Sequence, residues 1–149
     1  RRNECLGMIS DLNANVPACF INFLGRPAST FTGAAFMART MGAAILPVFI
    51  DRLPDNTHCM RYQPAILPAD TGDKERDLFY TTMRIHYVIG EEVRRRPHDW
   101  FWLLNRWKTR PEDVEHPEKI FMEHRDLTPA QVAEILAPVK AHAAATSTG

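Results

Sequence analysis

The 149-residue chain has little cysteine, no excess of either charge and no long apolar run. Its three cysteines, Cys5, Cys19 and Cys59, form no C-x-x-C pair and are odd in number, which argues against a disulfide framework. We expect them to be buried thiols in a reducing compartment. Lys plus Arg and Asp plus Glu both number 18, so a nucleic-acid binder that relies on a strongly basic field is disfavoured. Without an apolar run of about 18 residues, no segment is predicted to span a membrane.

Motifs that mark common active sites are also missing from the sequence. There is no G-x-S-x-G nucleophile elbow, no G-x-G-x-x-G dinucleotide fingerprint and no P-loop. The six histidines lack the spacing of zinc ligands, both among themselves and with cysteine. The sequence therefore predicts neither a metal site nor a cofactor.

What the chain does contain is the composition of a globular domain. Hydrophobic residues make up 45% and charged residues 24%, and a chain of this length can bury a core. The sequence starts without Met and enters an apolar segment soon after Arg1-Arg2, with no signal-peptide core. We interpret it as part of a single domain whose upstream portion is missing.

Hydrophobic periodicity divides the chain into alternating strands and helices. The predicted strands are 5–9, 18–24, 43–50 and 59–67, with a turn at 54–56. The predicted helices are 32–41, 73–95, 98–105 and a last one from a Thr128 capping box to about 140, before a frayed end at 141–149. The order predicts an α/β fold, a partial layered domain with a central mixed sheet flanked by helices.

The segment Gly25-Arg26-Pro27 interrupts an apolar run shortly before the predicted helix start at Thr32 and Gly33. The first turn of a helix carries unpaired N–H groups and the positive end of the macrodipole, which suit a phosphate or an oxyanion. Arg26 can add a charge that grips phosphate bidentately, and Gly33 permits close approach. The alternative is a plain strand, turn and helix in which a threonine only caps the helix, and spacing leaves both open.

A second feature is the tryptophan-rich segment 97–111. Trp100, Trp102 and Trp107 lie within eight residues, and residues 91–110 carry six basic and three acidic side chains. Indole rings beside surplus positive charge suit a membrane interface or an anionic lipid head group. The alternative is that the tryptophans pack inward and the arginines are solvated. Nucleic acid is disfavoured as a partner, because the acidic run 112–126 would repel phosphates.

Four blocks, taken in order, resemble the lipid A biosynthesis acyltransferases, the lauroyl/myristoyl transferase family of the lysophospholipid acyltransferase superfamily. They are Arg2 to Asp11, Asn22-Phe-Leu-Gly-Arg-Pro-Ala28, Thr32 to Arg39 with Ala43 to Phe49, and Trp100 to Pro111. The resemblance covers residues 1–113, which we interpret as the C-terminal part of an acyltransferase domain. Residues 114–149 fall outside it, as an acidic linker, a terminal helix and the frayed tail.

The resemblance implies transfer of an acyl chain from acyl carrier protein thioester to a hydroxyl of a phosphorylated lipid A precursor. It places this reaction at the cytoplasmic face of the bacterial inner membrane. In the family a His acts as general base and an acidic residue orients it, in an H-x4-D or H-x4-E motif upstream of the Gly-Arg-Pro-Ala block. The implied substrate-binding residues are Asp11, Gly25, Arg26, Thr32 and Gly33, and the implied membrane or lipid contacts are Trp102, Arg106, Trp107 and Lys108.

The catalytic motif itself is where the sequence departs from the family. Only His86 and Glu91 have the required spacing, and they lie downstream of the block in a predicted helix. Five residues turn a helix by about 140° relative to the starting side chain, so the pair points apart and is rejected as the dyad. We therefore assign no catalytic residue and expect no transferase activity from this chain by itself. The remaining alternatives are a non-enzymatic membrane-surface module and a glycerolipid or glycolipid acyltransferase of the same superfamily.

Overall fold

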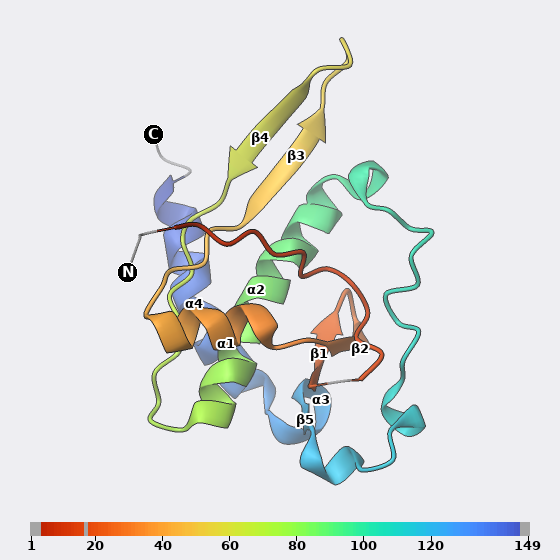
Figure 1. Cartoon of the computed structure of the whole chain (residues 1–149), viewed down its shortest axis with the longest axis vertical. Coiled ribbons are helices and arrows are strands. Elements are labelled where there is room, and N and C mark those ends of the chain that lie inside the picture. Colours follow the sequence, from red (N-terminus) through yellow and green to blue (C-terminus); the bar gives the residue numbers. More distant parts are fainter. Residues whose placement is uncertain (1–3, 17, 147–149) are drawn as a thin grey trace.

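The computed structural model describes residues 4–16 and 18–146 (Figure 1). Its strands are β1 (Cys19–Phe23), β2 (Arg26–Thr30), β3 (Val48–Arg52), β4 (His58–Tyr62) and β5 (Phe121–Met122). Its α-helices are α1 (Gly33–Met41), α2 (Lys74–Arg95), α3 (Glu123–Asp126) and α4 (Pro129–Thr146). Single 3-10 turns lie at Pro97–Asp99, Pro111–Asp113 and Pro117–Lys119.

The central sheet has the strand order β2-β1-β5 and is mixed, as predicted for the α/β class. β1 pairs antiparallel with β2 from Cys19↔Thr30 to Phe23↔Arg26, and it pairs parallel with β5 at only two positions. Leu24 and Gly25 form the turn with φ of 52° and 89°, the geometry of a tight hairpin that glycine adopts without strain. The interruption of the apolar run at Gly25-Arg26-Pro27 is therefore confined to the turn, and Arg26 is already the first residue of a strand that the sequence did not predict.

The hairpin β3–β4 forms a separate two-stranded sheet that projects from the rest of the molecule (Figure 1). The predicted turn at 54–56 is confirmed, with Asn56 N–H bonded to the Leu53 carbonyl. The two strands are shorter than predicted. Beyond them, the chain before β3 and after β4 stays in contact through the Gln63 N–H, which donates to the Pro47 carbonyl, and through an isolated bridge between Ile45 and Ile66.

Helix α2 is the element against which the rest of the chain packs, and its predicted bounds are nearly those observed. The Asp73 carboxylate accepts hydrogen bonds from the N–H groups of Glu75 and Arg76, which caps the first turn. One stretch of α2 joins a core cluster with β1 and β2, and another joins a second cluster with α4. The clusters are Phe23, Ala28, Ile66, Ile85, Ile89 and Val93, and Cys19, Ile21, Phe79, Met83 and Ile135.

The capping box predicted for α4 is confirmed: Gln131 N–H donates to the Thr128 hydroxyl, and Thr128 N–H donates to the Gln131 side chain. The helix continues to Thr146, six residues past its predicted end. The last part of the predicted frayed tail, 147–149, lies outside the described residues. No helix in the described part is long and apolar enough to cross a membrane.

Three local predictions fail because tertiary contacts override them. Residues 5–9 form no strand; instead the following segment is held by single bonds, Ala14 N–H to the Ser29 carbonyl and the Ser10 carbonyl to His86. Residues 98–105 form only a 3-10 turn followed by irregular chain. The thiols of Cys5 and Cys59 are exposed, and only Cys19 is buried as expected.

Candidate functional site

The tryptophan-rich segment packs two of its three indoles against the end of β1. The Phe23 ring, 1% exposed, has its centroid 5.6 Å from that of Trp100 and 6.0 Å from that of Trp107. Trp102 is instead 53% exposed, and its indole N–H donates to the Pro97 carbonyl. The inward-packing alternative therefore holds for Trp100 and Trp107, whereas a lipid contact of Trp102 stays a prediction.

Arg106 is the residue of this segment that departs most from expectation. It is only 2% exposed, donates to the Ser29 carbonyl and the Thr30 hydroxyl, and lies over the Phe23 ring. Burial lowers the pKa of its guanidinium to about 10, and its Nε has no hydrogen-bond partner. The prediction that Arg106 contacts lipid is contradicted by this burial, whereas Lys108 is exposed and Trp107 half-buried.

The residues predicted to seat an anion are divided between the two ends of β2. Gly25 and Arg26 lie at its start, and Thr32 and Gly33 follow its end, so the strand separates them by about 13 Å of extended chain. The Thr32 side chain makes no capping bond, and the Met8 methyl lies 3.5 Å from the place of a Cβ on Gly33. The structure does not bring these four residues together into one anion-binding site.

Arg26 and the fifth predicted substrate contact, Asp11, lie in different surroundings. Arg26 is exposed, and its guanidinium stacks over the Trp107 ring with its carbon 5.5 Å from the ring centroid. Asp11 is half-exposed and, together with Arg106, borders a void of about 20 Å³. Burial lowers the pKa of Arg106, and the negative charge of Asp11 partly opposes that lowering. Whether either residue binds substrate stays a prediction.

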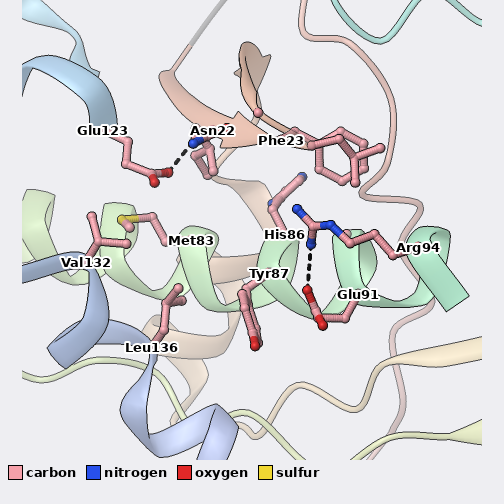
Figure 2. A pocket seen from close by; sticks show the side chains of 14 residues that line it. Asn22, Phe23, Met83, His86, Tyr87, Glu91, Arg94, Glu123, Val132 and Leu136 are labelled. Carbon is pink, nitrogen blue, oxygen red and sulfur yellow. Dashed lines mark hydrogen bonds and ion pairs between the residues drawn. The ribbon is translucent and has the colours of Figure 1, made fainter. Parts of the chain in front are cut away.

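A pocket of about 390 Å³ opens beside Gly25, between β1, α2 and α4 (Figure 2). Its apolar walls come from Ile21, Phe23, Leu24, Met83, Val132 and Leu136. Charged groups lie at its edges: the Glu123 carboxylate accepts a bond from Asn22 N–H at 2.8 Å, and Arg94 pairs with Glu91. Burial raises the pKa of Glu123. The turn after β1 is thus open to a cavity on one side.

The sequence offered one signal of this pocket that was not used. Gly90 interrupts the apolar face of α2, and glycine inside a helix often marks a close approach. Here it gives the pocket part of its α2 wall. Glu123 and the α4 residues carried no such signal, because their place beside β1 depends on the path of the chain after residue 110.

His86 and Glu91, the one pair with the spacing of the family dyad, do not form one. His86 is buried, with Nδ1 2.9 Å from the Thr82 carbonyl and Nε2 2.8 Å from the Ser10 carbonyl. Burial and the nearby Arg106 charge lower the pKa of His86 to about 4. In the neutral ring only one of these nitrogens donates to its carbonyl, but both face backbone oxygens, so neither is placed to take a proton from an acceptor hydroxyl.

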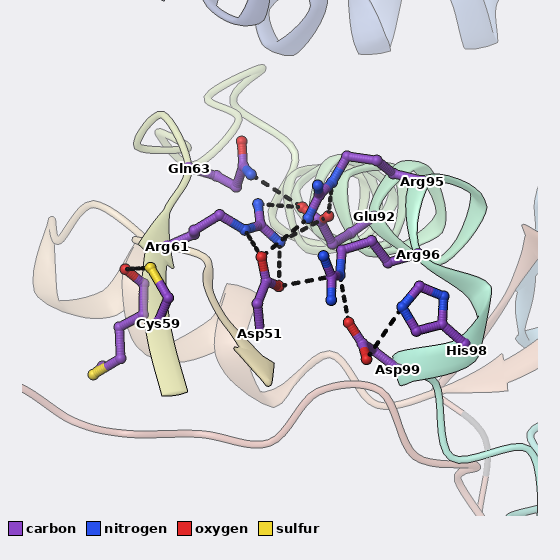
Figure 3. Close-up of polar contacts among 10 residues, drawn as sticks. Asp51, Cys59, Arg61, Gln63, Glu92, Arg95, Arg96, His98 and Asp99 are labelled. Carbon is purple, nitrogen blue, oxygen red and sulfur yellow. Dashed lines mark hydrogen bonds and ion pairs between the residues drawn. The ribbon is translucent and has the colours of Figure 1, made fainter. Parts of the chain in front are cut away.

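A network of charges joins the β3–β4 hairpin to the C-terminal end of α2 (Figure 3). Arg61 donates to both oxygens of Asp51 and to Glu92, which also pairs with Arg95. The hydrogen bond from Arg61 lowers the pKa of Asp51 to about 2. These groups satisfy one another, and the described residues hold no cluster of three or more His, Cys, Asp or Glu suited to a metal ion.

Residues 1–109 match the family model described as Bacterial lipid A biosynthesis acyltransferase. The chain belongs to that family. A lipid A biosynthesis lauroyltransferase of Escherichia coli (strain K12) is 33% identical over 92 residues, which is 62% of this chain and 29% of the relative. The chain therefore spans less than a third of that relative's length.

The family match ends before the C-terminal side of the pocket. The lipid A acyltransferase segment contributes β1, the turn and α2, whereas Glu123, Val132 and Leu136 lie beyond residue 109. All the predicted site residues lie inside the matched segment. The predicted division of the chain at residue 113 stays a prediction.

Proposed function

We propose that this chain is part of an acyltransferase that moves a fatty acyl group from acyl carrier protein thioester to a hydroxyl of a phosphorylated lipid A precursor. The observation that carries the proposal is the family match over residues 1–109. The name of the E. coli relative, a lauroyltransferase, supports a medium-length saturated acyl group as the one transferred.

Within that reaction, this chain contributes binding groups and no general base. Arg26 presents an exposed guanidinium next to the turn, where it suits the anionic part of the acceptor. The base that removes the proton from the acceptor hydroxyl is supplied by residues outside this chain, since His86 is occupied by backbone carbonyls. We expect this chain to transfer no acyl group by itself.

A chimera tests the proposal. The 92-residue matching segment of the E. coli lauroyltransferase is replaced by the corresponding part of this chain, and transfer of radiolabelled lauroyl groups to a lipid A precursor is measured. We expect the chimera to be active, and Arg26→Ala in it to raise KM for the acceptor. Arg52→Ala, which removes another exposed positive charge, serves as the matched control. A folded chimera without transfer would refute the proposal, and unchanged kinetics in the Arg26 variant would remove that residue's role.

The same enzyme is proposed to act at the cytoplasmic face of the bacterial inner membrane. The observation that supports contact with lipid is the exposed run Phe101, Trp102, Leu103 and Leu104, beside the exposed Lys108. If the chain is instead a non-enzymatic membrane-surface module, it would use the same run, but the chimera would be inactive. A glycerolipid or glycolipid acyltransferase would differ in the acceptor that the chimera uses.

A further inference from the structure

We propose that the pocket beside β1 binds an organic cation, a guanidinium group carried on a short stem, through the carboxylate of Glu123. The proposal goes beyond acyl transfer and does not rest on it. Glu123, Val132 and Leu136 come from the chain after residue 109, so the site depends on a segment that lies outside the family match.

The position of the Glu123 carboxylate is set by the edge of the central sheet. β5 pairs with β1 only at Cys19 and Phe20, and the chain then enters α3. Beyond these two pairs, the Asn22 N–H donates to Glu123 Oε2 at 2.8 Å. The main chain of β1 therefore holds the carboxylate at the pocket, and its other oxygen accepts no hydrogen bond from any residue that the structure describes.

Glu123 also has no cation to balance its charge. No basic side chain in the described part of the chain pairs with it, and burial raises the pKa of its carboxyl group. Arg125, two residues further on, is held by Asp126 and by the Pro117 and Ile120 carbonyls. A carboxylate that is partly removed from water is stabilised by a cation brought next to it.

The other titratable groups of the pocket leave this negative charge in place. Arg94 pairs with Glu91, so their charges cancel, and burial keeps the His86 imidazole neutral by lowering its pKa to about 4. Lys140 lies over the Tyr87 ring, with its Nζ 5.4 Å from the ring centroid, rather than in an ion pair. The described lining therefore carries one net negative charge, which attracts a cation and repels an anion.

The rest of the lining is mixed and favours a cation that also has apolar surface. Figure 2 shows Glu123 on the same side of the pocket as Met83 and Val132. The rings of Phe23 and Tyr87 line the same volume of about 390 Å³. A guanidinium has hydrogen-bonding edges for a carboxylate and faces that stack on aromatic rings, so it matches both parts of the lining. A wholly apolar ligand would bury the carboxylate without a partner.

The test compares two ligands of nearly the same shape, n-butylguanidinium and its neutral analogue n-butylurea, by isothermal calorimetry on this chain. We expect the cation to bind saturably and the urea to bind at least tenfold more weakly, because hydrogen bonds between charged groups are the stronger ones. Glu123→Gln keeps an oxygen that can accept from the Asn22 N–H but removes the charge, so it should abolish the preference for the cation. Glu118→Gln, at a 65% exposed carboxylate of the same segment, is the matched control and should leave the preference unchanged.

A third ligand, N-acetyl-arginine N-methylamide, distinguishes the two sources of such a cation. Binding as tight as that of n-butylguanidinium assigns the site to an arginine side chain of a peptide. Binding of n-butylguanidinium alone assigns the site to a free small molecule, and both results support the site.

Methyl NMR on the unmutated protein keeps the proposal falsifiable if Glu123→Gln does not fold. Resonances of Ile21, Val132 and Leu136 should shift with n-butylguanidinium, and those of Leu103 should not. Absence of saturable binding, equal affinity for the urea, or shifts confined to Leu103 would each overturn the site. A preference for the cation that survives in a folded Glu123→Gln, or that is lost equally in Glu118→Gln, would overturn it as well.

Discussion

Arg26 and Arg106 carry the same guanidinium and meet the same aromatic cluster, yet only one of them is buried. Arg106 stacks on Phe23 and bonds to Ser29 and Thr30, whereas Arg26 stacks on the outer side of Trp107. The difference follows from the β1–β2 hairpin, which carries Thr30 to the inside and Arg26 to an exposed strand end. No pattern in the sequence separates the two arginines.

Removing the buried guanidinium should destabilise the fold. Arg106→Met leaves the Ser29 carbonyl and the Thr30 hydroxyl without their buried donor, and we expect a loss of about 2–3 kcal/mol in the free energy of unfolding. Arg106→Lys should lower the free energy of unfolding by less, because the lysine ammonium can still donate to one of these two oxygens. Urea denaturation measures both.

The control for this prediction is Arg26→Met, which removes an exposed guanidinium from the same cluster. A cation–π contact at an exposed site contributes about 0.5–1 kcal/mol, so the loss should stay within that range. Equal losses at the two positions would show that the burial of Arg106 does not set its contribution.

His86 should make stability depend on pH. The pKa of its imidazole is about 4 when folded and about 6.5 when unfolded, so between these values the unfolded chain binds one more proton. The His86 contribution is therefore complete above pH 6.5 and is lost as the pH falls toward 4. By linkage the loss is at most about 3 kcal/mol. Thermal unfolding from pH 7 to pH 4 measures it.

The matched comparison is His86→Gln, which keeps a donor for one carbonyl and does not titrate. The stability of the wild type relative to the variant should fall as the pH falls, because only the wild type loses the His86 contribution. Glu123, whose raised pKa favours the folded state at low pH, is common to both and cancels in the comparison. Parallel curves over this window would contradict the assignment of His86 as a buried neutral group.

At the scale of the elements, local signals predicted helices well and strands poorly. The Asp73 cap, the apolar stripe of α2 and the Thr128 capping box are each encoded within a few residues, and all three were found. β2 was missed because Arg26–Thr30 has no strand pattern of its own and forms by pairing with β1. The helix predicted at 98–105 does not form, because Trp100 packs on Phe23 and the Trp102 indole N–H donates to the Pro97 carbonyl.

The hairpin β3–β4 should depend on its charged contacts with α2. Two-stranded hairpins are marginal in water by themselves, and Arg61 bonds to both Asp51 of β3 and Glu92 of α2. Arg95 and Arg96 pair with Asp51 at the longer distances of 3.5 and 3.6 Å. Arg61→Met should speed amide hydrogen exchange in residues 48–62 roughly tenfold and leave the protection of 79–89 unchanged. Exchange measured by mass spectrometry resolves the two segments.

The control on the same hairpin is Arg52→Met, because the Arg52 guanidinium donates to Asn56 within the hairpin itself. It should change exchange at the turn and nowhere else. Protection lost equally in α2 with Arg61→Met would show that the network stabilises the core rather than the hairpin.

At the scale of the whole molecule, apolar side chains are exposed in several separate places. One set covers the outer face of the hairpin, where Val48 lies opposite Tyr62 and Ile50 opposite Met60, and all four are 39–61% exposed. The other is the run 101–104, in which Leu103 is 86% exposed. Exposed apolar surface of this extent marks contact with another molecule, and the two sets compete as explanations of membrane binding.

Flotation on liposomes decides between them. The run 101–104 combines an indole with the nearby cation Lys108, the chemistry of an interfacial segment, whereas the hairpin face carries no tryptophan. We therefore expect the double change Trp102→Ser and Leu103→Ser to reduce the fraction that floats with anionic liposomes by more than half. Ile50→Ser should have little effect, and Lys108→Gln should weaken binding only at low salt, because surface charges are screened. Flotation abolished by Ile50→Ser instead would place the lipid contact on the hairpin and leave Trp102 exposed for another partner.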